Sequence, residues 1–204
     1  MSTAAAPGTI LRENLWTNNP IFMQILGICS ALAVTNLLTN TMIMTVAVVG
    51  VMGMTNLTVA LLKSFIPRKV RMMVQTLIIA SYVIVVDIIL RAYLPEISRA
   101  LGPYVGLIIT NCIIMGRAEA FAQSNAPLIS IWDGVTSAFG YMAVLLAIAL
   151  IRELLGFGSL FGYQVMPEFF RPWIIMVMPP SAFFVLGIII WIGKALMERE
   201  GAPA

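Results

Sequence analysis

The 204-residue sequence has no histidine, only two cysteines and few charged side chains. Without imidazole, the chain lacks a frequent ligand of zinc and haem and the usual proton shuttle of hydrolytic enzymes. Charged residues make up 10% of the sequence, whereas soluble domains carry about a quarter. The net charge of +3 is too small to predict a nucleic-acid partner. These absences argue against a soluble hydrolase and against a nucleic-acid-binding protein.

Apolar residues dominate what is present. They account for 60% of the chain, and the mean hydropathy is +0.98. A chain of this length can supply about six membrane spans of roughly 20 residues each, with little left for an aqueous domain. We therefore predict one membrane domain over residues 20–197, flanked by a cytoplasmic N-terminal segment (1–19) and a short C-terminal tail (198–204).

The first 20 residues do not have the pattern of a cleaved signal peptide. They are small or polar, and Arg12 and Glu13 interrupt them. The apolar run that follows leads directly into a second one, so we expect the first hydrophobic segment to be retained.

Two of the six predicted membrane segments are short. Residues 20–34 end at a polar patch, 35–40, and residues 103–115 end at the polar stretch 116–119. A helix of about 15 residues covers only ~22 Å of the roughly 30 Å hydrocarbon core. The four longer segments are residues 41–62, 72–94, 134–155 and 173–196.

One short segment is followed by two long ones, and this order occurs twice. The first occurrence is repeat one (20–95), and the second is repeat two (103–197). An odd number of segments in each repeat turns the second repeat upside down in the membrane. Short segments at equivalent positions are typical of discontinuous helices that meet near the membrane midplane. We predict an all-α integral membrane protein with six segments in two inverted three-segment repeats, the first and fourth being half-helices. The alternative is six ordinary helices.

Basic residues predict the orientation. Six crossings place both termini on the side where the connection between the second and third segments lies. Because Lys and Arg accumulate in cytoplasmic loops, this side is expected to be the cytoplasm. Four of the 12 basic residues are expected on the other side: Arg91, Arg99, Arg152 and Arg171. The connection itself carries Lys63, Arg68, Lys69 and Arg71.

The two cysteines, Cys29 and Cys112, occupy matching places in the two short segments. A pseudo-two-fold axis in the membrane plane would bring them face to face. A disulfide requires an oxidising compartment, whereas thiolates are soft ligands suited to iron or iron–sulfur centres. The remaining interpretation is two buried, unreactive small hydrophobes. Two thiolates cannot complete a four-thiolate site, so a metal centre would need ligands from a second subunit.

Two carboxylates are candidates for an ion path. Asp87 lies inside the third segment, where carboxylates are costly and usually functional, but Arg91 follows four residues on and allows a simple ion pair. Asp133 precedes the fifth segment and is either a helix N-cap or a carboxylate for cation entry. Arg117 and Glu119 either fix the end of the fourth segment or contact an ion or a partner.

The cysteine motifs Gly27-Ile28-Cys29-Ser30 and Thr110-Asn111-Cys112-Ile113 belong to longer stretches, residues 24–35, 106–113 and 116–122. Together with residues 85–87 and 152–156, these stretches resemble the D-type membrane subunits of the sodium-translocating NADH:quinone oxidoreductases, over nearly the whole membrane region. The E-type membrane subunits of the Rnf ferredoxin:NAD oxidoreductases are also similar, but their first cysteine is usually followed by proline, where this chain has Ser30.

The resemblance implies a protein of the bacterial inner membrane that pairs with a homologous, oppositely oriented E-type subunit. In that family the pair holds an intramembrane [2Fe-2S] cluster or iron centre, and Cys29 and Cys112 match its ligand positions. The cluster passes electrons between flavin centres on the way from NADH to ubiquinone while Na⁺ is pumped. No flavin-attachment motif of the Ser/Thr-Gly-Ala-Thr type and no dinucleotide fingerprint occurs in this chain. No complete active site is therefore expected on it.

Two rival functions remain open at this stage. One is an inverted-repeat transporter or channel in which Asp87 and Asp133 line the path and the cysteines are idle. The other is a structural subunit without a cofactor.

Overall fold

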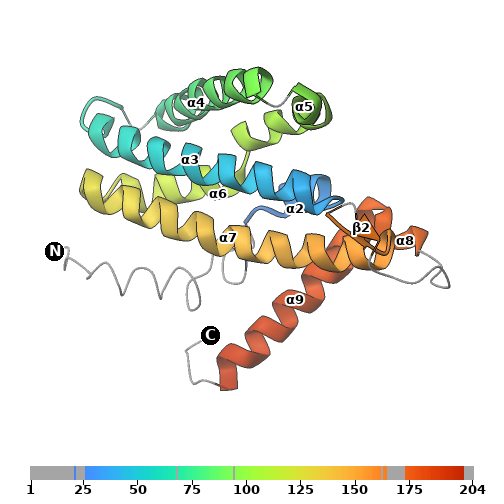
Figure 1. Cartoon of the computed structure of the whole chain (residues 1–204). Helices are drawn as coiled ribbons and strands as arrows, with labels where there is room; N and C mark the ends of the chain where they lie inside the picture. Colours follow the sequence, from blue (N-terminus) through green and yellow to red (C-terminus); the bar gives the residue numbers. More distant parts are fainter. Residues whose placement is uncertain are drawn as a thin grey trace.

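A computed structural model describes residues 21, 26–67, 69–93, 95–161, 163–164 and 173–199. Over these residues the chain is almost entirely helical (Figure 1). Five helical stretches are long and apolar enough to cross a membrane: Leu38–Leu62, Arg71–Tyr93, Tyr104–Ala122, Pro127–Gly156 and Pro179–Leu196. The predicted helical membrane fold is confirmed at this level. The N-terminal segment 1–19 and residues 20 and 22–25 of the first predicted segment lie outside the described residues.

Helices α3 (Leu38–Leu62) and α7 (Pro127–Gly156) form the centre of the bundle. They pack side by side and run in opposite directions, α3 from right to left and α7 from left to right in Figure 1. A Cβ added to Gly134 would lie 2.6 Å from Asn56 Nδ2 and 3.2 Å from the Met52 carbonyl oxygen. Glycine at this position therefore allows the two helices to approach closely.

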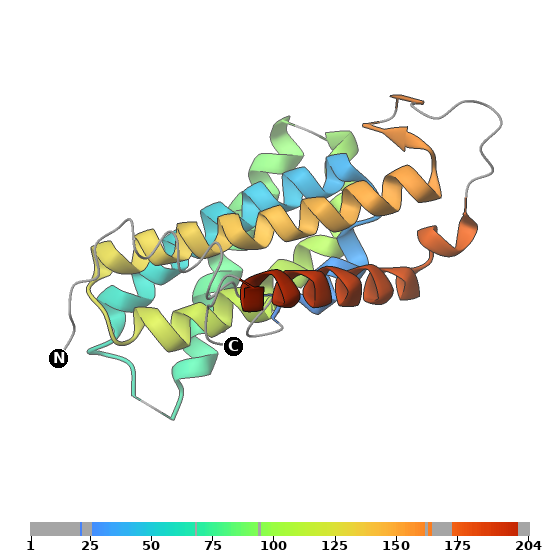
Figure 2. The ribbon, with the colours of Figure 1, turned by 90° about the horizontal axis from the view of Figure 1, so that it is seen from below.

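The outer helices flank this central pair. Helix α4 (Arg71–Tyr93) packs on α3 and on α5 (Pro95–Ile109), whereas α9 (Pro179–Arg199) packs on α7 and on α2 (Ile28–Val34). In Figure 1 α4 lies at the top of the bundle and α9 at the bottom, so α9 is in front when the bundle is seen from below in Figure 2. An antiparallel pair of two-residue strands, β1 (Ser159–Leu160) and β2 (Tyr163–Gln164), follows α7 and was not predicted from the sequence.

The first predicted segment contains the short helix α2, which begins immediately after Gly27. Gly27 has a φ of 88°, a left-handed conformation that glycine adopts without strain. Helix α2 ends at Val34, and α3 begins at Leu38. Only the first residues of the polar patch 35–40 therefore interrupt the helical structure. The rest of the patch is helical because the Glu153 carboxylate accepts a hydrogen bond from the Leu38 N–H at 2.5 Å.

The fourth segment is longer than the sequence predicts. Helix α5 starts at Pro95 rather than at residue 103 and ends at Ile109. After a break at Thr110 and Asn111, the chain continues as α6 (Cys112–Arg117) and the π-helix η2 (Ala118–Ala122). The polar stretch 116–119 was expected to end this segment, but it is helical because its two charges have partners on α7 and α4.

The fifth and sixth segments also differ from their predicted bounds. Helix α7 begins at Pro127, a residue favoured at the first helical position, and so includes the residues before 134. The sixth segment divides into α8 (Ile174–Val177) and α9, with Met178 extended between them. Proline restricts the residue before it to extended conformations, so Pro179 ends α8 and starts α9.

The connections 63–70 and 123–126 lie at the same end of the bundle. Lys63 Nζ donates a hydrogen bond to the Asn125 carbonyl oxygen at 2.8 Å. Arg71 forms an ion pair with Glu119, which also accepts a hydrogen bond from Gln75 Nε2 at 2.9 Å. Two residues of the basic cluster that predicts the cytoplasmic side, Lys63 and Arg71, thus lie near the start of α7 and the end of the fourth segment.

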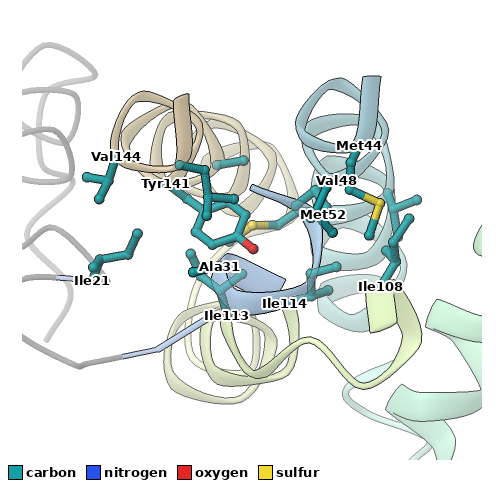
Figure 3. Packing of buried hydrophobic residues seen from close by; sticks show 14 of the residues in the cluster. Ile21, Ala31, Met44, Val48, Met52, Ile108, Ile113, Ile114, Tyr141 and Val144 are labelled. Atoms are coloured by element: carbon teal, nitrogen blue, oxygen red, sulfur yellow. The ribbon is translucent and has the colours of Figure 1, made fainter. Parts of the chain in front are cut away.

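The apolar core lies where α2, α3, α6 and α7 meet (Figure 3). The two short helices contribute Ala31 from α2 and Ile113 and Ile114 from α6, all at most 2% exposed. These side chains belong to one cluster with residues of the two central helices: Met44, Val48, Met52, Tyr141 and Val144. This packing holds the two short helices in place, and with them the cysteines at their starts.

Candidate functional site

The two cysteines occupy the starts of the two short helices. Cys29 lies in the first turn of α2, and Cys112 is the first residue of α6. Both side chains are exposed on the surface of the chain, and both thiols are free. The structure therefore contains no disulfide between them, and the interpretation as two buried hydrophobes is wrong.

Tyr141 of α7 connects the two cysteine-bearing segments. Its hydroxyl forms a hydrogen bond with the Ser30 hydroxyl and accepts a second one from Asn111 Nδ2 at 3.3 Å. Ser30 follows Cys29 directly and Asn111 directly precedes Cys112. The structure thus links the two segments that carry the cysteines to one hydroxyl.

The segment before Cys29 is shaped by close contact with the tyrosine ring. A Cβ on Gly27 would lie 2.6 Å from Tyr141 Cε2, so only glycine fits here. The Gly27 carbonyl accepts hydrogen bonds from the Ala31 N–H at 3.1 Å and from the Ser30 hydroxyl at 2.8 Å. These bonds tie the first turn of α2 to the left-handed glycine.

The segment before Cys112 is fixed by Asn111, the N-cap of α6. Its Oδ1 accepts a hydrogen bond from the Ile113 N–H at 3.2 Å, which satisfies one of the free amides at the start of the helix. The same side chain is 4% exposed and donates through Nδ2 to Tyr141. One residue therefore both starts the helix of Cys112 and links it to α7.

The donors of this site fit half of a thiolate-ligated centre. Among the described residues, no group of three or more His, Cys, Asp or Glu side chains is placed to hold a metal ion. Two exposed thiols on the surface of one chain are suited to sharing soft-metal ligation with a second subunit. The described part of this chain by itself therefore offers too few ligands for a complete metal site.

The second candidate site contains a buried ion pair between α6 and α7. Arg117 Nε donates to Asp133 Oδ2 at 3.1 Å, and the Arg117 Nη2 group forms an ion pair with Oδ1. The two side chains are 7% and 1% exposed, and the guanidinium also lies 5.5 Å from the centre of the Phe121 ring. Asp133 lies well inside α7, whose N-cap is Ala126, so its interpretation as a helix N-cap is wrong.

Oxygen atoms without a hydrogen-bond partner lie in the same central part of the bundle. Thr55 Oγ1 and Asn56 Oδ1 on α3 and Ser137 Oγ on α7 are buried and unpaired in the described part of the chain. Asn56 uses its Nδ2 to donate to the Ser130 carbonyl oxygen at 3.3 Å, and Ser130 and Ser137 flank Asp133 on α7. Buried polar atoms usually have partners, so these unpaired oxygens need an explanation. The sequence offered a signal for them, since polar residues interrupt apolar helices at these positions.

Asp87 lies apart from this central site. It forms an i,i+4 ion pair with Arg91, with 2.8 Å between Oδ2 and Nη2, so the predicted pair is confirmed. The Asp87 side chain is 20% exposed, and that of Arg91 is 70% exposed. Because α4 packs mainly on α3 and α5, the structure does not bring Asp87 together with Asp133.

Arg152 and Glu153 form a further buried polar group, which the functional interpretation of the sequence had not used. Arg152, one of the basic residues expected on the non-cytoplasmic side, is 1% exposed. Its guanidinium donates to Thr35 Oγ1 at 2.6 Å and to the carbonyl oxygens of Met176, Val177 and Met178, each at 3.2 Å. It thus holds the C-terminal ends of α2 and α8 against α7.

Comparisons with known proteins identify the family of the chain. The family model described as "Rnf-Nqr subunit, membrane protein" matches residues 8–190. The D-type subunit of Na(+)-translocating NADH-quinone reductase from Pseudomonas paraeruginosa is 50% identical over 187 residues, covering 89% of this chain and 84% of the relative. The corresponding protein from Shewanella sp. (strain ANA-3) is 47% identical over 205 residues, covering 98% of each.

Proposed function

Because the chain belongs to the Rnf-Nqr family of membrane subunits, we propose that it relays electrons inside a sodium-translocating NADH:quinone reductase. The family resemblance predicted from the sequence is confirmed. The similar proteins from Pseudomonas and Shewanella are subunits of a multisubunit enzyme, so this chain is expected to act together with further subunits.

The observation that carries the proposal is the pair of exposed, free thiols held at one site through Tyr141. Cys29 and Cys112 would provide two of the four thiolates of a [2Fe-2S] cluster, and a homologous E-type membrane subunit would provide the others. A cluster bound there would supply one-electron transfer within the membrane. This chain's part is to present the two thiolates at a fixed spacing and to exclude water from one side of the site.

The inverted repeat belongs to the same proposal. The broken first segment, α3 and α4 would correspond to the broken fourth segment, α7 and α9. The antiparallel packing of α3 and α7 supports this correspondence, as do the breaks that directly precede each cysteine helix. A partner built on the same plan in the opposite orientation would then meet this chain at the cysteine face. The expected location is the inner membrane, with both termini in the cytoplasm.

Single substitutions of the cysteines test the relay. Cys29→Ala and Cys112→Ala, each alone, are expected to remove the intramembrane iron and to abolish quinone reduction, because the site has no spare ligand. The measurements are iron and acid-labile sulfide in complexes that purify with all their subunits, together with NADH oxidation by an artificial acceptor. That partial reaction should survive.

Thr110→Ala is a suitable control, since it removes an exposed side chain next to the site and leaves both thiols in place. It should retain the iron and the activity. Normal quinone reduction with an intact iron signal in either cysteine variant would rule out the relay.

A second candidate function is an ion path through the α3–α7 interface. The unpaired oxygens of Thr55, Asn56 and Ser137 near Asp133 favour it, because oxygen atoms are the ligands that hard cations prefer. Asp87 lies apart on α4, so it would serve such a path only outside the α3–α7 interface. Its test is the Na⁺ dependence of turnover after neutral replacement of these carboxylates.

A further inference from the structure

We propose that Tyr141 is a positioning residue that sets the separation of Cys29 and Cys112. Its hydroxyl is the shared partner of Ser30 and Asn111, the direct neighbours of the two cysteines. The three bridging side chains are at most 4% exposed, so the link is shielded from water. This inference rests on the proposed function only where it connects the thiol spacing to a metal centre.

The direction of each hydrogen bond in the link follows from the available donors. Ser30 uses its hydroxyl proton on the Gly27 carbonyl, so it can only accept from Tyr141. Tyr141 therefore donates its single proton to Ser30 and accepts from Asn111 Nδ2. The amide of Asn111 is oriented in turn because its Oδ1 accepts from the Ile113 N–H.

The resulting chain of hydrogen bonds leads from the N-cap of α6 to the left-handed turn before α2. It runs in one direction through Asn111, Tyr141 and Ser30 to the Gly27 carbonyl, and each donor in it has one acceptor. Such a chain allows little rearrangement, because reversing any bond would leave a buried donor or acceptor unpaired.

Packing fixes the tyrosine itself. The ring of Tyr141 is 1% exposed and its edge lies against the Cα of Gly27, leaving no room for a Cβ there. Figure 3 shows the ring pointing from α7 toward the short helices. The Tyr141 hydroxyl therefore has a fixed position on a long central helix. Both cysteine-bearing segments are held in place by hydrogen bonds to it.

Tyr141→Phe isolates the role of this oxygen, because the ring and its packing remain. The buried amide of Asn111 and the hydroxyl of Ser30 then lose their common partner, and the two cysteine segments are free to shift relative to each other. Tyr82→Phe is a matched control. The Tyr82 hydroxyl also links two helices, through Thr58 Oγ1 at 2.6 Å, but it contacts neither cysteine segment.

Thiol cross-linking of the full-length chain measures the separation without a metal. Because Cys29 and Cys112 are the only cysteines, a series of bis-maleimides of increasing spacer length can be used on the chain as it stands. In the wild type, one spacer length should give the highest yield. Tyr141→Phe should lower that yield by about threefold, measured relative to single-thiol labelling, as expected for the loss of one buried hydrogen bond. It should also make the cross-linking yield depend less on spacer length. Tyr82→Phe should match the wild type.

The assembled complex supplies a second readout. If Cys29 and Cys112 ligate iron, Tyr141→Phe should retain the iron but change the paramagnetic resonance spectrum and the midpoint potential of the centre, whereas Tyr82→Phe should not. Ser30→Ala is the second variant, to be used if Tyr141→Phe does not fold, and it should change the cross-linking profile in the same direction.

The two proposals fail in distinguishable ways. Unchanged cross-linking profiles in both Tyr141→Phe and Ser30→Ala would overturn the positioning role, even if the iron centre is present. Wild-type complex without cysteine-bound iron would overturn the relay, while an altered cross-linking profile in Tyr141→Phe would still support the positioning role.

Discussion

At the scale of single residues, the buried charges determine which side chains can be substituted without destabilising the fold. Arg117 and Asp133 neutralise each other inside the bundle, whereas Arg152 binds carbonyl oxygens at the ends of two helices. A buried charge is strongly destabilising when its partner is removed. Loss of activity in a single charge variant is therefore ambiguous between function and folding.

A double variant resolves this ambiguity for Asp133. Asp133→Asn alone should lower the free energy of unfolding by about 3–5 kcal/mol, because it leaves the Arg117 guanidinium buried without that carboxylate. Arg117→Gln combined with Asp133→Asn removes both charges and should restore most of the thermal stability of the complex. If Asp133 belongs to an ion path, the double variant should remain stable but need more Na⁺ for half-maximal turnover.

Asp87→Asn is the comparison for the same experiment. Its partner Arg91 is 70% exposed, so the pair contributes at most about 1 kcal/mol and the variant should fold normally. Wild-type Na⁺ dependence in both the Asp87 variant and the double variant would rule out a path through these carboxylates.

At the scale of elements, the close packing of α3 against α7 depends on glycine. At Gly134 a Cβ would displace the Asn56 amide, which donates to the Ser130 carbonyl, and would press on the Met52 carbonyl oxygen. Gly50 lies on the same central helix as Asn56, but its Cβ would meet nothing within 4 Å. Both glycines therefore lie in helices, and they differ in the room that is available for a Cβ atom.

Gly134→Ala should destabilise the complex by about 1–3 kcal/mol, because overpacking forces two helices apart. Gly50→Ala should be neutral or slightly stabilising, because alanine favours a helix more than glycine does. Thermal unfolding of the two variants in the same detergent measures the difference. Equal melting temperatures would show that α3 and α7 are less tightly packed than described.

At the scale of the whole molecule, the connections at the two ends of the bundle determine the topology. Lys63 and Asn125 join the connections before α4 and before α7, and α7 and α9 are each long and apolar enough for one further crossing. We therefore expect the C-terminus on the same side as the basic cluster, in the cytoplasm.

A reporter fused after residue 204 tests this topology. A reporter that is active only in the cytoplasm should be active in the fusion, and one that is active only in the periplasm should not. A second fusion within residues 165–170, in the connection between α7 and α8, should show the opposite pattern. Periplasmic activity of the C-terminal fusion would overturn the orientation and place the connection before α7 outside the cell.

The sequence by itself determined the membrane class, most of the helical regions, the sites of the two cysteines and the family. These features follow from local properties, because hydropathy over about 20 residues selects spans and a motif of a few residues identifies relatives. Helices α3 and α4 accordingly lie close to their predicted bounds, residues 41–62 and 72–94. The Asp87–Arg91 pair could be proposed for the same reason, since both residues lie on one helix.

Only the tertiary structure decided which polar groups meet. Residues 116–119 and 127–133 lie outside the predicted segments 103–115 and 134–155. They are nevertheless helical, and in the structure Arg117 pairs with Asp133 on α7 and Glu119 pairs with Arg71 on α4. Nothing local distinguishes Tyr141 from any other aromatic residue in an apolar helix. Its role at the cysteine site arises because the packing of α2, α6 and α7 brings three distant segments to one hydroxyl, and such contacts depend on the fold as a whole.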